Sequence, residues 1–120
     1  MTAIYIAYLF AIIVLSILPG SEGPPLIPNI DKVMHFVAYS GLAILSMIVF
    51  RKVSSRILGL TAGICLGIAL EFVQAQVPGR YVSVLDALAN AIGIGAGAII
   101  FLKFQQLFLQ VAAHISNKKP

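Results

Sequence analysis

Four apolar stretches, each close to the length of a transmembrane helix, constrain this chain more than any other feature. They run from about 3 to 18, 31 to 50, 57 to 76 and 84 to 102. A bilayer core is crossed by about 20 predominantly apolar helical residues. The chain is 60% hydrophobic and 10% charged, more apolar than a soluble domain of 120 residues can bury. We therefore predict one all-α integral membrane domain over residues 1–120, a bundle of four transmembrane helices.

The basic residues predict the orientation of this bundle. Six Lys and Arg residues, with no acidic residue among them, lie in the segment 51–56 and in the tail after residue 102. The opposite side carries only Lys32 and Arg80. Because cytoplasmic loops are enriched in Lys and Arg, we expect both termini in the cytoplasm. The first stretch has no preceding basic region and no A-x-A-like cleavage site, so we predict a span there and not a signal peptide.

The C-terminal tail from Lys103 to Asn117 is predicted to be amphipathic. Helical spacing places its large apolar side chains on one face and its Gln, His and Asn side chains on the other. We expect either a cytoplasmic extension of the fourth span or an interfacial helix, with His114 solvated. The single Cys65 lies in an apolar run, where it is expected to pack as a small hydrophobic residue.

Polar and ionisable side chains recur at one end of three apolar stretches. Such groups are costly in a membrane, and they indicate a functional site unless they cap or pair. All of them are expected in the outer third of the bilayer. They are Asp31, His35 and Tyr39 in the second stretch, Glu71 and Gln74 in the third, and Asp86 and Asn90 in the fourth.

Glycines indicate which way these polar groups face. In the third stretch, glycine recurs every fourth residue from Gly59 to Gly67, and Glu71 follows at the same interval. In the fourth stretch, Gly93 and Gly97 continue the stripe of polar residues. Small residues at this spacing mark faces on which membrane helices approach closely. We therefore expect the polar side chains to face the bundle interior and not the lipid.

Purely structural roles remain open for several of these residues. Asp31 and Asp86 have the positions of helix caps, and Lys32 that of a snorkelling interfacial lysine. Asn90 has the chemistry of an interhelical hydrogen bond. Tyr39 is equally compatible with an interfacial aromatic side chain, and Glu71 with an ion pair to His35 or Arg80 that only fixes the packing. For Arg80 we favour a planar fork that holds an anionic headgroup.

The motifs in this region also resemble a known family. The elements D-K-x-x-H-F-x-x-Y from Asp31, E-x-x-Q from Glu71, the Gly-Arg pair ending at Arg80, and D-x-x-x-N from Asp86 follow one another in the order and spacing of the VanZ-like family, over about residues 31–97. The resemblance implies a multi-pass protein of the bacterial cytoplasmic (inner) membrane. It also implies a link to the cell envelope and to low-level resistance to the glycopeptide teicoplanin.

Three kinds of function fit the predicted site. The first is binding or processing of a membrane lipid or a lipid-linked envelope precursor. The second is acid/base or metal-dependent hydrolysis of a lipid headgroup, although no H-x-x-x-H or E-x-x-H pair supports a metal. The third is a proton-coupled carrier, which would require a homo-oligomer. The cofactor is left open, and no basic cluster with interleaved aromatics indicates nucleic acid.

The candidate residues divide by their chemistry. A carboxylate and an imidazole that are partly buried suit general acid and base roles. Amide, hydroxyl and guanidinium groups suit the binding of a polar headgroup. The catalytic candidates are His35, Glu71 and Asp86, and the ligand-binding candidates are Asp31, Tyr39, Gln74, Arg80 and Asn90.

Overall fold

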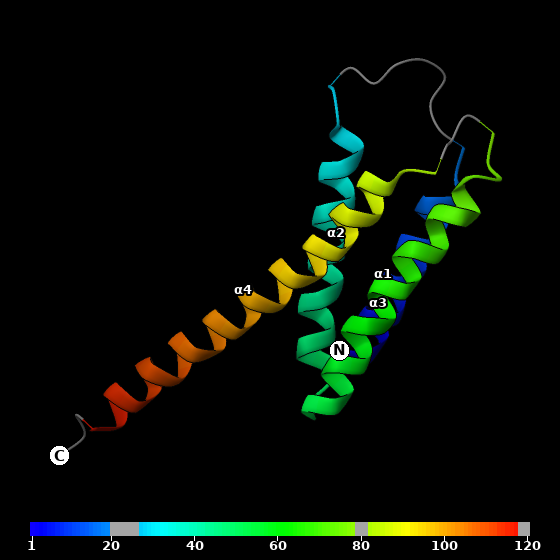
Figure 1. The fold of residues 1–120 in the computed structure, drawn as a ribbon. Coiled ribbons are helices and arrows are strands. Elements are labelled where there is room, and N and C mark those ends of the chain that lie inside the picture. The colour runs from blue at the N-terminus through cyan, green and yellow to red at the C-terminus, as the bar shows by residue number, and fades with distance from the viewer. Residues whose placement is uncertain (20–26, 79–81, 118–120) are drawn as a thin grey trace.

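Four helices make up the described part of the chain. The computed structural model describes residues 1–19, 27–78 and 82–117. The all-helical prediction and the number of helices are confirmed within these ranges. The helices are α1 (Thr2–Ile17), α2 (Ile30–Val49), α3 (Val53–Gln74) and α4 (Val84–Asn117) (Figure 1).

Three of these helices are long and apolar enough to cross a membrane. They are α2, α3 and α4, with mean hydropathies of 1.6, 1.8 and 1.9. The chain is therefore a membrane protein. α1 is apolar but has only 16 residues, and at 1.5 Å per residue it is about 24 Å long, shorter than a hydrocarbon core of about 30 Å. A complete fourth span stays a prediction.

The start of α3 differs from the sequence prediction. A span from about 57 was expected after a polar loop over 51–56, but the helix begins at Val53. Two hydrogen bonds of Arg56 explain the early start: its backbone N–H donates to Lys52 O at 3.0 Å, and its side-chain Nε donates to Phe50 O at 2.8 Å. The basic segment thus supplies the first helical turn of α3, and only a short connection separates α2 from α3.

The fourth helix continues beyond the predicted span of about 84–102. It continues through Asn117, for 34 residues in all, and projects away from the other helices (Figure 1). No Gly or Pro interrupts residues 98–117, so nothing in the sequence stops the helix. Arg56 lies over the ring of Phe101, 5.2 Å from its centroid, and beyond that contact every side chain from Leu102 to Asn117 is exposed. A continuous extension of the fourth helix is therefore what the structure has.

α2 and α4 make the closest helix pair. A Cβ atom added at Gly93 would lie 2.5 Å from the carbonyl oxygen of Phe36, and one at Gly97 would meet the carbonyl oxygen of Ser40. The hydroxyl of Ser40 also donates to Gly93 O at 3.0 Å. Only glycine allows this approach of two helix backbones, which fixes the depth of α4 relative to α2.

The glycines of α3 face side chains of the neighbouring helices and not their backbones. Added Cβ atoms at Gly63 and Gly67 would meet side chains, Ile94 in the first case and Asn90 and Tyr39 in the second. Bulky side chains of α2 and α4 therefore fill the space over these glycines. The same face of α3 leads to Glu71, which is 3% exposed.

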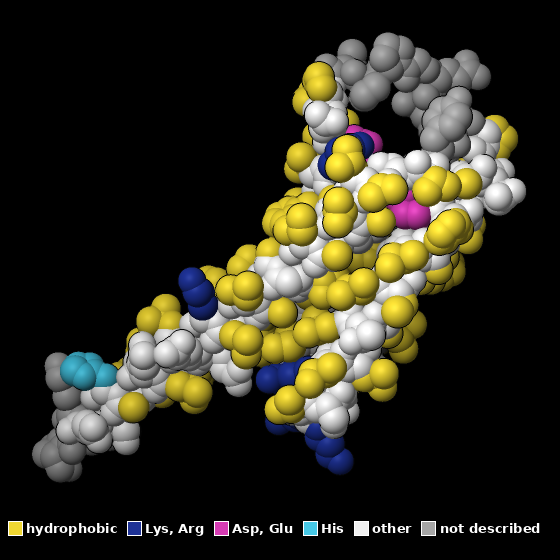
Figure 2. All heavy atoms as spheres, in the orientation of Figure 1, with side chains coloured by type: hydrophobic (Ala, Val, Ile, Leu, Met, Phe, Trp, Pro, Cys, Tyr) yellow, Lys and Arg dark blue, Asp and Glu magenta, His cyan; other side chains and the backbone are white. Residues whose placement is uncertain are grey.

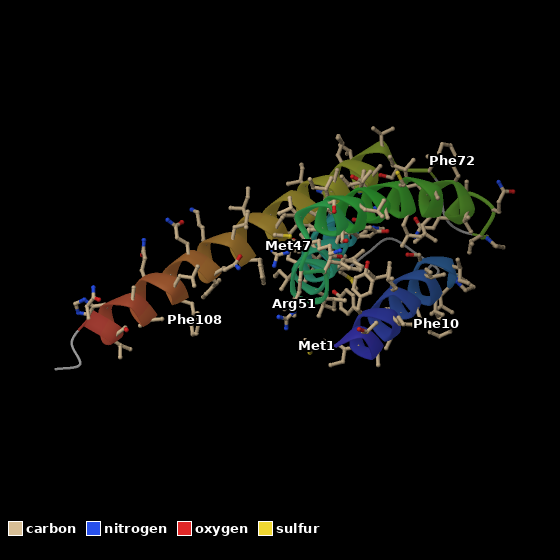
Figure 3. All side chains as sticks on the ribbon, turned by 90° about the horizontal axis from the view of Figure 1, so that it is seen from below. Met1, Phe10, Met47, Arg51, Phe72 and Phe108 are labelled. Carbon is tan, nitrogen blue, oxygen red and sulfur yellow. The ribbon has the colours of Figure 1, made fainter. Side chains whose placement is uncertain are left out.

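The surface is largely apolar, as expected for a chain in contact with lipid. In the view of Figure 2, acidic side chains appear near one end of the helices with a basic side chain beside them, and the other basic side chains lie toward the opposite end. Met1 and Arg51 lie at one end of the bundle and Phe72 at the opposite end (Figure 3). The charges are thus separated along the bundle, whereas its orientation in the membrane stays a prediction.

Candidate functional site

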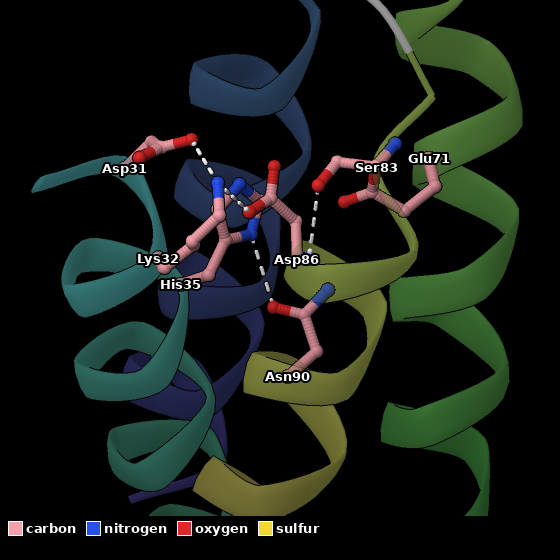
Figure 4. Close-up of polar contacts among 7 residues, drawn as sticks. All are labelled: Asp31, Lys32, His35, Glu71, Ser83, Asp86 and Asn90. Atoms are coloured by element: carbon pink, nitrogen blue, oxygen red, sulfur yellow. Dashed lines mark hydrogen bonds and ion pairs between the residues drawn. The ribbon is translucent and has the colours of Figure 1, made fainter. Parts of the chain in front are cut away.

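Three ionisable side chains from three helices meet in one place. His35 comes from α2, Glu71 from α3 and Asp86 from α4, and one ligand atom from each lies within 4.8 Å of the other two (Figure 4). Glu71 and Asp86 are buried, and His35 is partly buried. His35 and Asp86 lie within two turns of the start of their helices and Glu71 within two turns of the end of α3, so the three side chains meet at one end of the bundle.

Ser83 is the residue before α4 and influences where the side chain of Asp86, in the first turn of that helix, points. The backbone N–H of Asp86 donates to Ser83 Oγ at 3.2 Å, so Ser83 is the helix cap. In a capping box, the acidic side chain three residues later would accept the N–H of the cap residue. Here Glu71 accepts it instead, with 3.2 Å between Ser83 N and Glu71 Oε2. Asp86 is therefore not the cap, and its carboxylate is available to neighbours on α2.

Lys32 supplies one such neighbour. Its Nζ lies 2.8 Å from Asp31 Oδ2 and 3.1 Å from Asp86 Oδ1, so the ammonium bridges the first turns of α2 and α4. Asp31 is half exposed and lies at the rim, whereas the side chain of Asp86 is 12% exposed. The cap of α2 is not Asp31 but Asn29, which has a left-handed backbone (φ 59°) and makes no side-chain capping bond.

Asn90 holds the imidazole of His35. His35 Nδ1 lies 3.0 Å from Asn90 Oδ1. Because an amide oxygen is only an acceptor, Nδ1 donates the hydrogen, and in the neutral ring Nε2 then carries a lone pair. Figure 4 shows the imidazole pointing toward Asp86 and Asn90 from α2. Asn90, which was expected to form an interhelical hydrogen bond, thus orients the imidazole of His35.

The other predicted ligand-binding residues lie in different surroundings. Tyr39 is 2% exposed and belongs to the apolar core with Leu42 and Ile94. Gln74 is buried, and its Nε2 donates to Ser16 O at 3.0 Å, which ties α3 to the end of α1. Arg80 lies outside the described residues. The cluster at this end of the bundle therefore brings together His35, Glu71, Asp86 and Asn90, with the half-exposed Asp31 at its rim.

The cluster is rich in carboxylates. Asp31, Glu71 and Asp86 supply three, of which Asp31 and Asp86 pair with Lys32, and Glu71 accepts the backbone N–H of Ser83. Buried carboxylates in a low-dielectric region require a positive charge, a proton or hydrogen-bond donors. The arrangement is suited to proton transfer through His35, to binding a cation, and to accepting hydrogen bonds from a polar headgroup.

Two contributions to this site were missed or underrated from the sequence. Lys32 was expected to snorkel at the interface, but it bridges Asp31 and Asp86. The sequence feature that could have predicted this bridge is an Asp-Lys pair at the same depth as an acidic residue of another helix. The bond from the backbone of Ser83 to Glu71 had no signal at all, because a backbone donor carries no residue identity.

The comparisons with known proteins identify a family. The family model described as VanZ/LLP1 matches residues 2–109. The resemblance drawn from the sequence motifs is confirmed by this match. A search of curated proteins and a search of solved structures found no match.

Proposed function

The chain belongs to the VanZ/LLP1 family, and we propose that it binds an amphipathic, lipid-linked envelope ligand at the mouth formed by α2, α3 and α4. One observation carries this proposal: partly buried His35 and buried Glu71 and Asp86 converge from three helices at one end of a bundle whose remaining surface is largely apolar. The polar cluster would receive the headgroup, and the lipid-facing sides of the helices would accompany the tail.

The roles within this site follow from the positions of the side chains. Asp31 lies at the rim, where it would meet the outer part of a headgroup, and Asn90 lies at the base. Tyr39 would contribute to the apolar core below the headgroup, and Gln74 would hold α1 beside the site. Arg80 is proposed from the sequence alone to hold an anionic group of the ligand.

The proposal is tested by the lipids that remain bound after purification. Glu71→Gln keeps an oxygen that can accept the Ser83 N–H and removes the charge, so the helix connection is retained. Wild-type protein is expected to retain a defined lipid or lipid-linked species by mass spectrometry, and Glu71→Gln to retain much less of it. Equal amounts in both proteins would reject the site.

We also propose that the activity supports low-level resistance to teicoplanin and that the protein resides in the bacterial cytoplasmic membrane with its polar mouth outward. Family membership and the segregation of charges along the bundle support this. Expression of the wild type in a teicoplanin-susceptible host should raise the inhibitory concentration, and Glu71→Gln at equal expression should not. No change with the wild type would remove the link to resistance and leave the binding proposal to its own test.

A second candidate function is hydrolysis of the ligand headgroup. The proximity of an imidazole to two carboxylates, within 4.8 Å, favours it. His35 would act as general base toward water, with Glu71 or Asp86 as the acid that protonates the leaving group. Turnover of the bound lipid by wild-type protein, lost in His35→Gln and kept in His114→Gln, would establish hydrolysis. Bound lipid that stays intact would leave binding as the function.

A further inference from the structure

We propose that His35, Glu71 and Asp86 bind one divalent transition-metal ion, with His35 Nε2 and one carboxylate oxygen from each acid as its protein ligands. Each residue offers a ligand atom within 4.8 Å of the other two. Ligand atoms about 2.0–2.2 Å from one ion lie about 3–4.4 Å apart. Small side-chain movements therefore suffice to close the three atoms around an ion.

The tautomer of His35 suits this role. Metal-bound histidines usually donate their second ring N–H to an oxygen acceptor, which fixes the ring and makes the ligating nitrogen more basic. His35 has this arrangement: Nδ1 donates to Asn90 Oδ1 at 3.0 Å. Nε2 of the neutral ring is then an acceptor. A cation can bind it, whereas the carboxylates of Glu71 and Asp86, which lie within 4.8 Å of a nitrogen of this ring, have no hydrogen to donate when ionised.

Asn90 gives a second, independent indication of a ligand. It is 2% exposed, and within the described chain its Nδ2 has no hydrogen-bond partner. This amide nitrogen lies on the side of Asn90 that faces α3 (Figure 4). An unsatisfied buried donor costs about 1–3 kcal/mol, and it is suited to an oxygen atom such as that of a metal-bound water or headgroup. Asn90 is a positioning residue in this scheme.

The ligand types of the cluster favour a transition-metal dication. Asp86 is buried, and its Oδ1 lies 3.1 Å from the Nζ of Lys32. Lys32 is partly exposed and long enough to swing toward Asp31, with which it also pairs. An imidazole with two carboxylates matches Zn²⁺ or Mn²⁺ better than Mg²⁺, which prefers oxygen ligands and water.

The test uses the full-length protein in detergent, stripped with chelator and titrated with Zn²⁺ alone. Calorimetry is expected to show one site per chain. His35→Gln and Asp86→Asn are each expected to weaken Zn²⁺ binding at least about 10-fold. The matched control is His114→Gln, on the projecting part of α4, which should stay within about threefold of the wild type.

A second readout does not depend on variants of the ligands. The chain has two histidines, so ¹⁵N-histidine spectra of the His114→Gln protein report on His35 alone. Zn²⁺ should shift the Nε2 resonance and leave Nδ1 protonated. An imidazole that is protonated on both nitrogens and does not respond to Zn²⁺, or equal losses in His114→Gln and His35→Gln, would overturn the metal site.

The metal proposal does not depend on the proposed function. Zn²⁺ binding is measured without lipid, and the retained lipid is measured without added metal. A protein that keeps its lipid but binds no Zn²⁺ would overturn only the metal site. A protein that binds Zn²⁺ but keeps no lipid would overturn only the ligand-binding proposal.

Discussion

The backbone N–H of Ser83 donates a hydrogen bond to Glu71 Oε2 at 3.2 Å, and this bond joins the last turn of α3 to the first residue before α4. It replaces the bond that Asp86 would make in a capping box. The carboxylate of Asp86 is thereby directed toward Lys32, at 3.1 Å. Because Glu71 and not Asp86 accepts the Ser83 N–H, the carboxylate of Asp86 takes part in the interhelical cluster and not in the helix cap.

The first prediction concerns the hydroxyl of Ser83. Ser83→Ala removes the acceptor for the Asp86 N–H and should lower the free energy of unfolding by about 1 kcal/mol. Ser83→Thr keeps a hydroxyl and should lose less. Thermal unfolding followed by circular dichroism in detergent measures both. Retained lipid should be unchanged in the two variants, because the bond to Glu71 uses the backbone; a loss of lipid in Ser83→Thr would contradict this assignment.

The second prediction concerns the contact between α2 and α4. Gly93→Ala places a methyl group 2.5 Å from Phe36 O, so the helices must separate, and we expect a loss of about 1–3 kcal/mol in stability. Gly95→Ala is the matched control on the same helix, because no atom lies within 4 Å of the added Cβ. It should be neutral or stabilising by up to about 1 kcal/mol, since alanine is the better helix former. Equal destabilisation by both changes would contradict the packing.

The third prediction concerns Lys32. Lys32→Gln removes the ammonium that bridges Asp31 and Asp86 and should raise the affinity for Zn²⁺ by roughly threefold to tenfold, because one competing positive charge is lost. Arg51→Gln is the control, since Arg51 lies at the opposite end of the bundle (Figure 3). Calorimetric titration of both proteins makes the comparison. A lower affinity in Lys32→Gln would show that the ammonium supports the cation site.

The fourth prediction concerns topology. Both termini are predicted in the cytoplasm, so a fluorescent protein fused after the last residue should fluoresce, and alkaline phosphatase fused there should be inactive. The same reporters placed in the connection between α3 and α4 should give the reverse pattern. An active phosphatase at the C-terminus would reverse the orientation and place the polar mouth in the cytoplasm.

The sequence predicted the helices well because membrane insertion requires long apolar runs. α2 deviates by one residue at each end from the predicted span of about 31–50. The predicted loop over 51–56 was wrong, because hydrogen bonds of Arg56 allow α3 to begin at Val53. An extension of the fourth helix was one of the two forms expected for the tail, and α4 continues to Asn117 because no helix breaker follows residue 102.

The candidate site was predictable in position and less so in its bonding. Depth and helical phase were sufficient to place His35, Glu71 and Asp86 together, since each lies near the end of an apolar helix at the same end of the bundle. The partners of these side chains were not predictable, because they depend on rotamers and on close helix approach. The pairing of Asn90 with His35 and the bond from Gln74 to Ser16 became evident only in three dimensions.

The most direct test of the central claim is native mass spectrometry of purified protein, with the two histidines as a matched pair. His35 lies in the cluster, and His114 lies on the exposed end of α4. We predict that the wild type and His114→Gln retain the same lipid-linked species, and that His35→Gln retains at least about tenfold less of it. Equal retention in all three folded proteins would contradict a ligand site formed by the buried cluster.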